Sequence, residues 1–240
     1  SANADLNAKD PMLLIYRCLH FFLVGKFDEC INRLNFTDNI SDQTLVSLDE
    51  QNQKFFVIYR LYLKRLLDFI PSNIFNAPSC IFHLGESHSL SFAHHSINFH
   101  GGKHQIIPRI TLGAKAYHLQ TDSSNQFKSI TELNLASLPK CSKVFLSFGE
   151  IDCRFDEGLI SASQKYGYDL KDLIKDTVEG YLNWCKEMLM KYDHSFFIFN
   201  VPAPVFDESL TESENSLVAD TIFHFNSLLS HTAKSLRINV

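Results

Sequence analysis

Between residues 11 and 70, apolar positions recur with the period of an α-helix. The first run, Met12–Val24, is closed by a glycine, and a shorter run over Phe27–Leu34 follows it. A third run predicts one long helix over about 44–70. Prolines and asparagines over 71–78 then interrupt the helical pattern, so we place a domain boundary there.

From residue 79 onward, short apolar runs alternate with amphipathic stretches. The runs predict strands over Cys80–Leu84, Gln105–Ile110, Lys143–Phe148 and Ser195–Phe199, with a fifth strand beginning within Leu236–Val240. Pro108 suits a strand end or an edge strand, because proline cannot donate to a sheet ladder. Helical stripes cover 170–189 and 217–233, and the capping box Thr211–Glu214 opens the second stripe.

Strands that alternate with helices predict an α/β domain with a mostly parallel sheet covered on both faces. In such sheets, ligands bind at the carboxyl ends of the strands. Two glycine-containing motifs, over 85–89 and 149–154, fall at two such ends. We therefore search for chemistry at these two motifs.

Composition and charge narrow the class of protein. The 240-residue chain is 45% hydrophobic and contains 21 Phe, which predicts packed domains rather than disorder. Its net charge of −5, without a basic block, argues against nucleic acid as a partner. Met12–Val24 is too short to span a bilayer, and no export signal is visible, so we expect a cytoplasmic location and no membrane span. We interpret Ser1–Ala4 as an expression scar.

Cysteine and histidine spacing bears on metal binding. The six cysteines are widely separated, which predicts buried reduced thiols and gives no support for a zinc knuckle. Six histidines between His83 and His104 leave zinc or a di-metal centre as an alternative, although their spacing shows no convergent ligand geometry. We interpret His94 and His95 as opposite faces of a helix, and 100–104 as a flexible loop. We expect neither a metal nor a cofactor.

Ser87 follows the strand over 80–84 within Gly85-Glu86-Ser87-His88-Ser89. A serine on a tight turn after a strand exposes its hydroxyl, and neighbouring backbone N–H groups can stabilise an oxyanion. The alternative is that Ser87 is an ordinary helix N-cap.

The stretch Leu84-Gly85-Glu86-Ser87-His88-Ser89 resembles the first block of the SGNH/GDSL hydrolase superfamily, in its Gly-Asp-Ser-His variant. That variant is typical of carbohydrate esterases and O-acetyltransferases. The resemblance implies that Ser87 is the nucleophile and that its backbone N–H helps to form the oxyanion hole. Glu86 stands in place of the usual aspartate. Glu86, His88 and Glu150 are candidate substrate contacts.

Later blocks of the resemblance are partial. Gly113 has the position of the second-block oxyanion glycine, although a turn requirement explains it equally well. Gly149 and Asp152 match the third block, but Ile151 stands where the family has a donor asparagine. Arg154 is a candidate replacement donor. The alternative is a surface salt-bridge cluster that contains Glu150, Asp152, Arg154 and Asp156.

The family's final Asp-x-x-His, which supplies the base, has no counterpart in the chain. Asp220 and His224 lie inside a predicted helix at the wrong spacing. We therefore expect either that the domain is truncated at its C-terminus or that the base is absent.

These observations predict a small all-α domain over 5–75, similar to a tetratricopeptide hairpin, followed by a three-layer, flavodoxin-like SGNH domain over 76–240. The implied function is a Ser87-dependent acyl-ester hydrolase or O-acyltransferase that acts on an acylated carbohydrate or another small ester. The alternatives are an impaired SGNH-fold module that binds a glycan or a protein, and a scaffold whose helical N-terminus recruits a protein partner.

Overall fold

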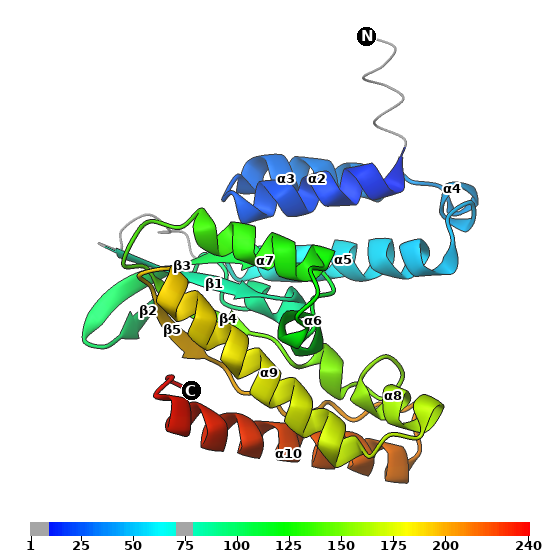
Figure 1. The fold of residues 1–240 in the computed structure, drawn as a ribbon. Helices are drawn as coiled ribbons and strands as arrows, with labels where there is room; N and C mark the ends of the chain where they lie inside the picture. Colours follow the sequence, from blue (N-terminus) through cyan, green and yellow to red (C-terminus); the bar gives the residue numbers. More distant parts are fainter. Residues whose placement is uncertain (1–9, 71–78) are drawn as a thin grey trace. The chain divides into compact units, whose positions relative to one another are not determined.

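The computed structural model describes residues 10–70 and 79–240 (Figure 1). The interpretation of Ser1–Ala4 and the expected boundary at 71–78 lie outside these residues. The elements in chain order are α2 Pro11–Leu23, α3 Phe27–Thr37, α4 Asp42–Val46, α5 Glu50–Asp68, β1 Ser79–Gly85, η1 Ser87–Leu90, β2 Ser96–Phe99, β3 Gly102–Ile110, α6 Ala116–Gln120, α7 Gln126–Ala136, β4 Lys143–Ser147, η2 Ile151–Cys153, α8 Leu159–Tyr166, α9 Leu170–Lys191, β5 Ser195–Ile198 and α10 Glu212–Leu236.

The chain divides into two compact units. Among the described residues, unit 1 comprises 10–70 and 92–105, and unit 2 comprises 79–91 and 106–240. The sequence places everything from residue 76 onward in one domain, whereas the structure groups 92–105 with the helices. The boundary between the units falls inside β3, after Gln105.

Unit 1 is built on helices α2, α3 and α5, whose apolar faces bury Phe22, Leu34 and Phe56 completely or almost so. The helices over 12–24 and 27–34 are confirmed as α2 and α3. The single helix over 44–70 is wrong, because the chain forms α4 and then restarts as α5. The side chain of Asp49 accepts the backbone N–H of Asn52 and so begins the new helix.

A β-hairpin belongs to unit 1, so this unit is not all helical. Strands β2 and β3 pair in antiparallel register around His100 and Gly101, both of which have positive φ. Positive φ at both turn positions is the conformation that favours a tight hairpin. The interpretations of 94–95 as helical and of 100–104 as a flexible loop are therefore wrong. His94 has a positive φ of 64°, and its Nε2 lies 2.8 Å from the carbonyl oxygen of Phe22.

The sheet has the strand order β2-β3-β1-β4-β5, and β1–β4 and β4–β5 are parallel pairs. All four predicted strands are confirmed, which establishes an α/β fold with a mostly parallel sheet. Pro108 lies inside the sequence of β3, but β2 pairs only as far as Gln105. Proline therefore occupies a part of β3 that β2 does not reach, where no ladder donor to β2 is needed.

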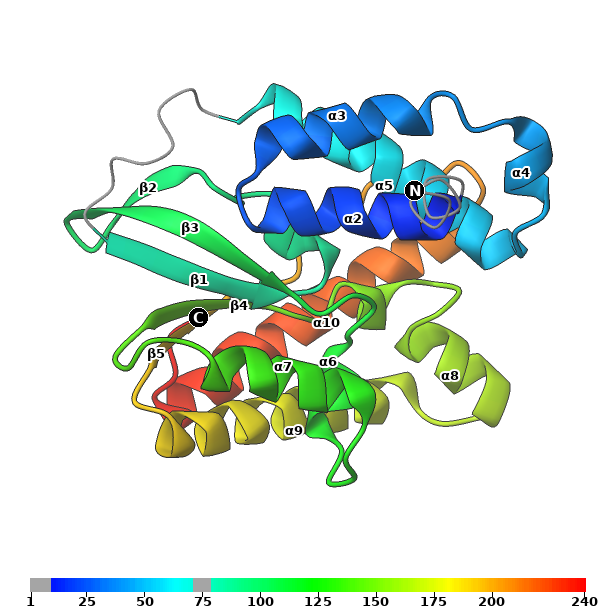
Figure 2. The same cartoon turned by 90° about the horizontal axis from the view of Figure 1, so that it is seen from above.

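One face of the sheet in unit 2 forms the main core. The register places Phe82 beside Val144 and Val144 beside Phe196, and two residues further along it aligns the apolar residues Leu84, Leu146 and Ile198 in the same way. These side chains pack against residues of α6, α7, α9 and α10. Figure 2 shows the ribbons of α7 and α9 running below β4 and β5. Trp184 on α9 joins this core, as the helical stripe predicts. The three-layer, flavodoxin-like arrangement stays a prediction.

The sequence misses α6, α7 and α8, which are short or weakly periodic. It predicts α9 and α10 correctly, and the Thr211–Glu214 capping box is confirmed. The fifth strand is reduced to an isolated parallel bridge between Phe197 and Asn239.

All six cysteines are free, but Cys80 and Cys141 are exposed, which corrects the expectation that all are buried.

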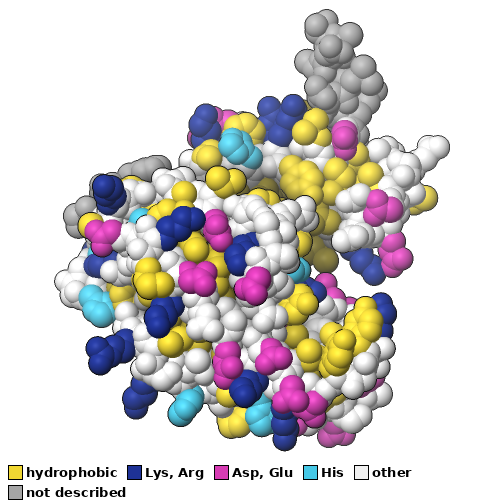
Figure 3. Space-filling model, viewed as in Figure 1, with side chains coloured by type: hydrophobic (Ala, Val, Ile, Leu, Met, Phe, Trp, Pro, Cys, Tyr) yellow, Lys and Arg dark blue, Asp and Glu magenta, His cyan; other side chains and the backbone are white. Residues whose placement is uncertain are grey.

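The surface charges are mixed, as expected for a chain without a basic block. Over α7 and α9, Lys and Arg side chains are intermixed with Asp and Glu (Figure 3). Among the described helices, none combines the length and apolar character needed to cross a membrane.

Candidate functional site

The turn after β1 presents Ser87. Glu86 is the N-cap of the 3-10 helix η1, because its carboxylate accepts the backbone N–H of His88 at 3.0 Å. Ser87 is the first residue of that helix and is partly exposed. The alternative interpretation of Ser87 as an ordinary N-cap is therefore wrong, since its neighbour fills that position.

Close strand packing positions this turn. The carbonyl oxygen of Gly85 accepts the N–H of Thr111 at 2.8 Å, and the N–H of Glu86 lies 3.4 Å from the carbonyl oxygen of Ser147. A Cβ on Gly85 would lie 2.5 Å from that same Ser147 oxygen, which is closer than van der Waals contact permits. Only glycine allows β1 and β4 to approach this closely at the turn.

The carboxylate of Glu86 is the centre of a hydrogen-bonded network. It is 1% exposed, and it accepts from the Ser87 hydroxyl at 2.9 Å. The His88 Nδ1 lies 2.9 Å and 3.0 Å from its two oxygens. Because an ionised carboxylate only accepts, this contact assigns the Nδ1 proton to the histidine. Both oxygens of the buried Glu86 carboxylate therefore have hydrogen-bond partners, which offset the cost of removing the carboxylate from water.

Glu150, from the loop after β4, extends the network to a third segment. Its Oε2 lies 3.7 Å from the His88 Nδ1. Its carboxylate also accepts from the Arg154 Nε at 3.0 Å and pairs with the Arg154 Nη2 at 2.9 Å. The hydrogen bond to Glu86 raises the pKa of His88 above its ordinary value against the opposing effect of burial, and the charges of Glu86 and Glu150 add to the rise.

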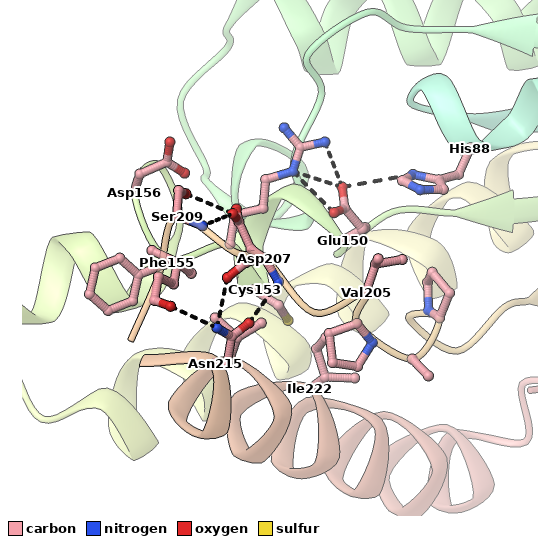
Figure 4. Close-up of a pocket in the computed structure, with 16 residues that line it drawn as sticks. His88, Glu150, Cys153, Phe155, Asp156, Val205, Asp207, Ser209, Asn215 and Ile222 are labelled. Atoms are coloured by element: carbon pink, nitrogen blue, oxygen red, sulfur yellow. Dashed lines mark hydrogen bonds and ion pairs between the residues drawn. The ribbon is translucent and has the colours of Figure 1, made fainter. Parts of the chain in front are cut away.

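A pocket of about 460 Å³ adjoins this network (Figure 4). His88, Glu150 and Arg154 line one side of it, and segment 202–210 and α10 line the other. Of the described residues at the β1 turn, His88 lines this pocket and Ser87 does not. The basic and acidic groups of the network are therefore aimed at a space large enough for a small substrate.

Arg154 is held by two carboxylates rather than one. Its Nη1 pairs with Glu157, while its Nε and Nη2 pair with Glu150. This arrangement matches part of the salt-bridge alternative and still leaves the guanidinium on the pocket wall. Its use as an oxyanion donor stays a prediction.

Asp152 serves a different part of the fold. It is buried, its Oδ2 accepts the N–H of Ala116 at 2.7 Å, and its Oδ1 accepts the N–H of Tyr117 at 3.0 Å. Burial raises the pKa of Asp152 to about 6, against these two hydrogen bonds. Asp152 lines a second pocket, of about 450 Å³, and does not join the salt-bridge cluster that the sequence suggests. We therefore leave it out of the proposed catalytic set.

The remaining motif residues are backbone determinants. Gly113 has φ of 68° and Gly149 has φ of 120°, conformations that favour glycine. A Cβ on Gly149 would lie 2.9 Å from the ring of Phe225 and 3.0 Å from Val201. Ile151 is 7% exposed, so an apolar side chain is buried where the resemblance expects a donor.

The histidines between 83 and 104 do not gather at one point. The Nε2 of His83 pairs with the Ser147 hydroxyl at 3.0 Å, and the Nε2 of His104 pairs with the Phe99 carbonyl at 3.2 Å. Among the described residues, the group with metal-ligand composition is Glu86, His88 and Glu150, whose ligand atoms lie within 4.8 Å of one another. The same carboxylates also accept from Ser87 and Arg154.

We expect His83 to make the fold sensitive to acid. The side chain is 1% exposed, and burial lowers the pKa of His83 to about 4. Because the folded pKa lies below the unfolded value of about 6.5, the contribution of neutral His83 to the unfolding free energy is complete above pH 6.5. It declines as the pH falls through 6.5 toward 4, by about 3 kcal/mol in all. Asp152, whose pKa is raised by burial, acts in the opposite direction below pH 6.

The measurement compares urea unfolding of the wild type and His83→Met between pH 7 and pH 4. The free-energy difference between the two proteins should move in favour of the variant as the pH falls. His231→Gln, at an exposed position on α10, is the control for the loss of an imidazole. A difference that does not vary with pH would contradict the burial argument.

Two parts of the site escape prediction from the sequence. The pairing of His88 with Glu86 is missed, because the sequence does not show that Glu86 caps the 3-10 helix and so faces the His88 ring. The pocket wall over 202–210 is also missed. Its signal is a Pro-Ala-Pro run at the end of β5 followed by Val205 and Phe206.

Comparison of the chain with protein-family models, with curated proteins and with solved structures finds no match. The resemblance to the SGNH hydrolases thus depends on the motif residues alone. The function has to be argued from the geometry of the site itself.

Proposed function

We propose that this chain is an acyl-ester hydrolase or O-acyltransferase in which Ser87 forms the acyl-enzyme. The observation that carries the proposal is the convergence of the Ser87 hydroxyl and the His88 imidazole on the buried carboxylate of Glu86. A serine needs an adjacent base to become a nucleophile, and this carboxylate lies 2.9 Å from its oxygen. Acylated carbohydrates or other small esters are the substrates that the resemblance suggests.

In the proposed reaction, the Glu86–His88 pair acts as the general base and then as the general acid. The Ser87 oxygen bonds to the ester carbonyl carbon as its proton passes to Glu86. The tetrahedral intermediate then breaks its bond to the leaving oxygen, which takes up a proton from the pair. A water molecule or a sugar hydroxyl next attacks the acyl-enzyme, gives its proton to the pair and releases the acyl product. Ser87 regains its proton in the last step, so the cycle balances.

We assign stabilisation of the oxyanion to backbone N–H groups from two loops. The backbone N–H groups of Ser87 and Gly113 are the proposed donors, with the Arg154 guanidinium as a further one. Loss of one such donor lowers turnover by about 10²–10³ in enzymes of this type. Because Ile151 supplies no donor, we expect a slow enzyme.

A serine-reactive fluorophosphonate probe tests the proposal. We expect one equivalent of label on Ser87, located by peptide mass spectrometry, and no label in Ser87→Ala. Ser91→Ala is the matched control, because Ser91 is an exposed serine at the end of the same turn. Labelling that persists in Ser87→Ala, or that is absent from the wild type, would remove Ser87 as the nucleophile.

The second candidate function is a non-catalytic module that binds a glycan or a protein partner. Two observations favour it: Ile151 is apolar where a donor is expected, and Ser87 is not among the residues that line the pocket. Absence of labelling and of ester hydrolysis, together with intact folding by circular dichroism, would select this candidate.

A further inference from the structure

The segment between β5 and α10 is a fixed strap rather than a loose connection. The Asn226 side chain makes two hydrogen bonds with the backbone of Val201, at 2.8 Å and 2.9 Å. The Asn215 side chain makes the same pair with the backbone of Asp207, at 2.9 Å each. Both asparagines lie on α10, so this helix holds the strap, defined as residues 202–206, at its two ends.

The strap forms an apolar wall of the pocket that His88 and Glu150 also line. Pro202, Ala203, Pro204 and Val205 all contribute to that wall, and Val218 and Ile222 of α10 lie below it. In Figure 4, Val205 and Ile222 lie under Glu150, while Asp207 and Asn215 lie at the end where Phe155 is drawn. Apolar side chains therefore line the part of the pocket that lies under Glu150.

Exposure along the strap is unusual for large apolar side chains. Val205 is 90% exposed and the adjacent Phe206 is 66% exposed, whereas Ile222 below them is 8% exposed. Val205 lines the pocket, and Phe206 is its neighbour in the chain. Contiguous apolar surface at the edge of a pocket marks a binding surface for an apolar group.

The charged groups that line the pocket also have partners. Glu150 is paired with Arg154 at 2.9 Å, and Asp207 accepts from both the backbone N–H and the hydroxyl of Ser209. The carboxylates of Glu150, Asp156 and Asp207 line the pocket together with the one guanidinium of Arg154, so the lining disfavours a negatively charged ligand. A ligand with a neutral polar head and an apolar tail fits this division better than an anion.

We propose that the strap binds the acyl chain of the substrate, and that the chain is a medium-length alkyl group rather than acetyl. The inference rests on the proposed function, because the ester must lie beside His88 for its tail to reach Val205 and Ile222. An acetyl group would leave most of the 460 Å³ empty. Each additional methylene that is buried against the strap strengthens binding, which raises kcat/KM until the apolar wall is filled.

The experiment measures kcat/KM for p-nitrophenyl acetate, butyrate and octanoate, each divided by its rate of spontaneous hydrolysis. We expect the octanoate-to-acetate ratio to exceed 10 in the wild type and to fall about tenfold in Val205→Ser. Leu133→Ser is the matched control, because Leu133 is 69% exposed on α7 and lies outside the pocket. Its ratio should equal that of the wild type. A wild-type ratio near one, or equal ratios in all three proteins, would overturn the inference.

A binding measurement separates this inference from the proposed function. N-methyl octanamide has the shape of the substrate without its ester, and saturation-transfer NMR detects its binding whether or not Ser87 reacts. Binding that is lost in Val205→Ser, in a protein that hydrolyses no ester, would support the strap and refute the acyl-enzyme. Turnover of acetate and labelling of Ser87 without octanamide binding would refute the strap alone.

Discussion

Glu86→Gln should lower kcat for ester hydrolysis by about 10³-fold with little change in KM. Glutamine fills the same space, and its carbonyl oxygen can still accept the N–H of His88, so the turn is preserved. It cannot take up the proton of Ser87, and it removes the negative charge that faces the Nδ1 of His88. Steady-state kinetics with p-nitrophenyl butyrate, from pH 5 to pH 9, measures the loss.

Glu86→Asp is the conservative variant, because it keeps a carboxylate while shortening its reach by one methylene. We expect it to recover a part of the activity that Glu86→Gln loses. An NMR titration of His88 supplies the second readout: its raised pKa should fall in Glu86→Gln, because the hydrogen bond that raises it is to a charged carboxylate in the wild type. Equal activity in the wild type and Glu86→Gln would exclude the carboxylate as the base.

The raised pKa of His88 also has a consequence for stability. A group whose pKa is higher in the folded state stabilises the fold below its unfolded pKa, and the contribution disappears as the pH rises through the folded value. His88 thus favours the folded state at mildly acidic pH, whereas His83 opposes it there. The two effects are separated by the variants Glu86→Gln and His83→Met.

Gly85→Ala should cause the largest loss of stability, about 3 kcal/mol or more of unfolding free energy. The added Cβ would meet the Ser147 side chain and lie 2.5 Å from the Ser147 carbonyl oxygen, so relief requires β1 and β4 to move apart. These strands are parallel neighbours whose register ends at Gly85 and Ser147. Urea unfolding followed by circular dichroism measures the change.

Gly167→Ala provides the matched control for the loss of a glycine. Gly167 ends α8 in a left-handed conformation with φ of 73°, and a Cβ there would meet nothing within 4 Å. We expect a cost of about 1 kcal/mol, which reflects backbone strain alone. A loss in Gly85→Ala no larger than in Gly167→Ala would show that the close approach of the two strands is not what requires glycine.

Much of the fold follows from local pattern. The strand runs ending at Gly85 and near Gly149, the amphipathic stripe of α9 and the capping box of α10 are all predicted correctly, because each signal lies within one element. The errors occur where an element is short or weakly periodic, or where a cap or a turn conformation overrides the pattern. Asp49 restarts a helix that the apolar period alone would continue, and positive φ at His100 and Gly101 turns an apparent loop into a hairpin.

By itself, the sequence determined the α/β class, the strand ends that carry the two motifs, and the position of Ser87 on a turn. Only the tertiary structure decided that Glu86 is the cap and the acceptor, that Asp152 holds the N-terminus of α6, and that Asn215 and Asn226 fix the strap. The physical reason is that periodicity records which face of an element is buried. Hydrogen-bond partners depend instead on which segments the fold brings within about 3 Å of one another.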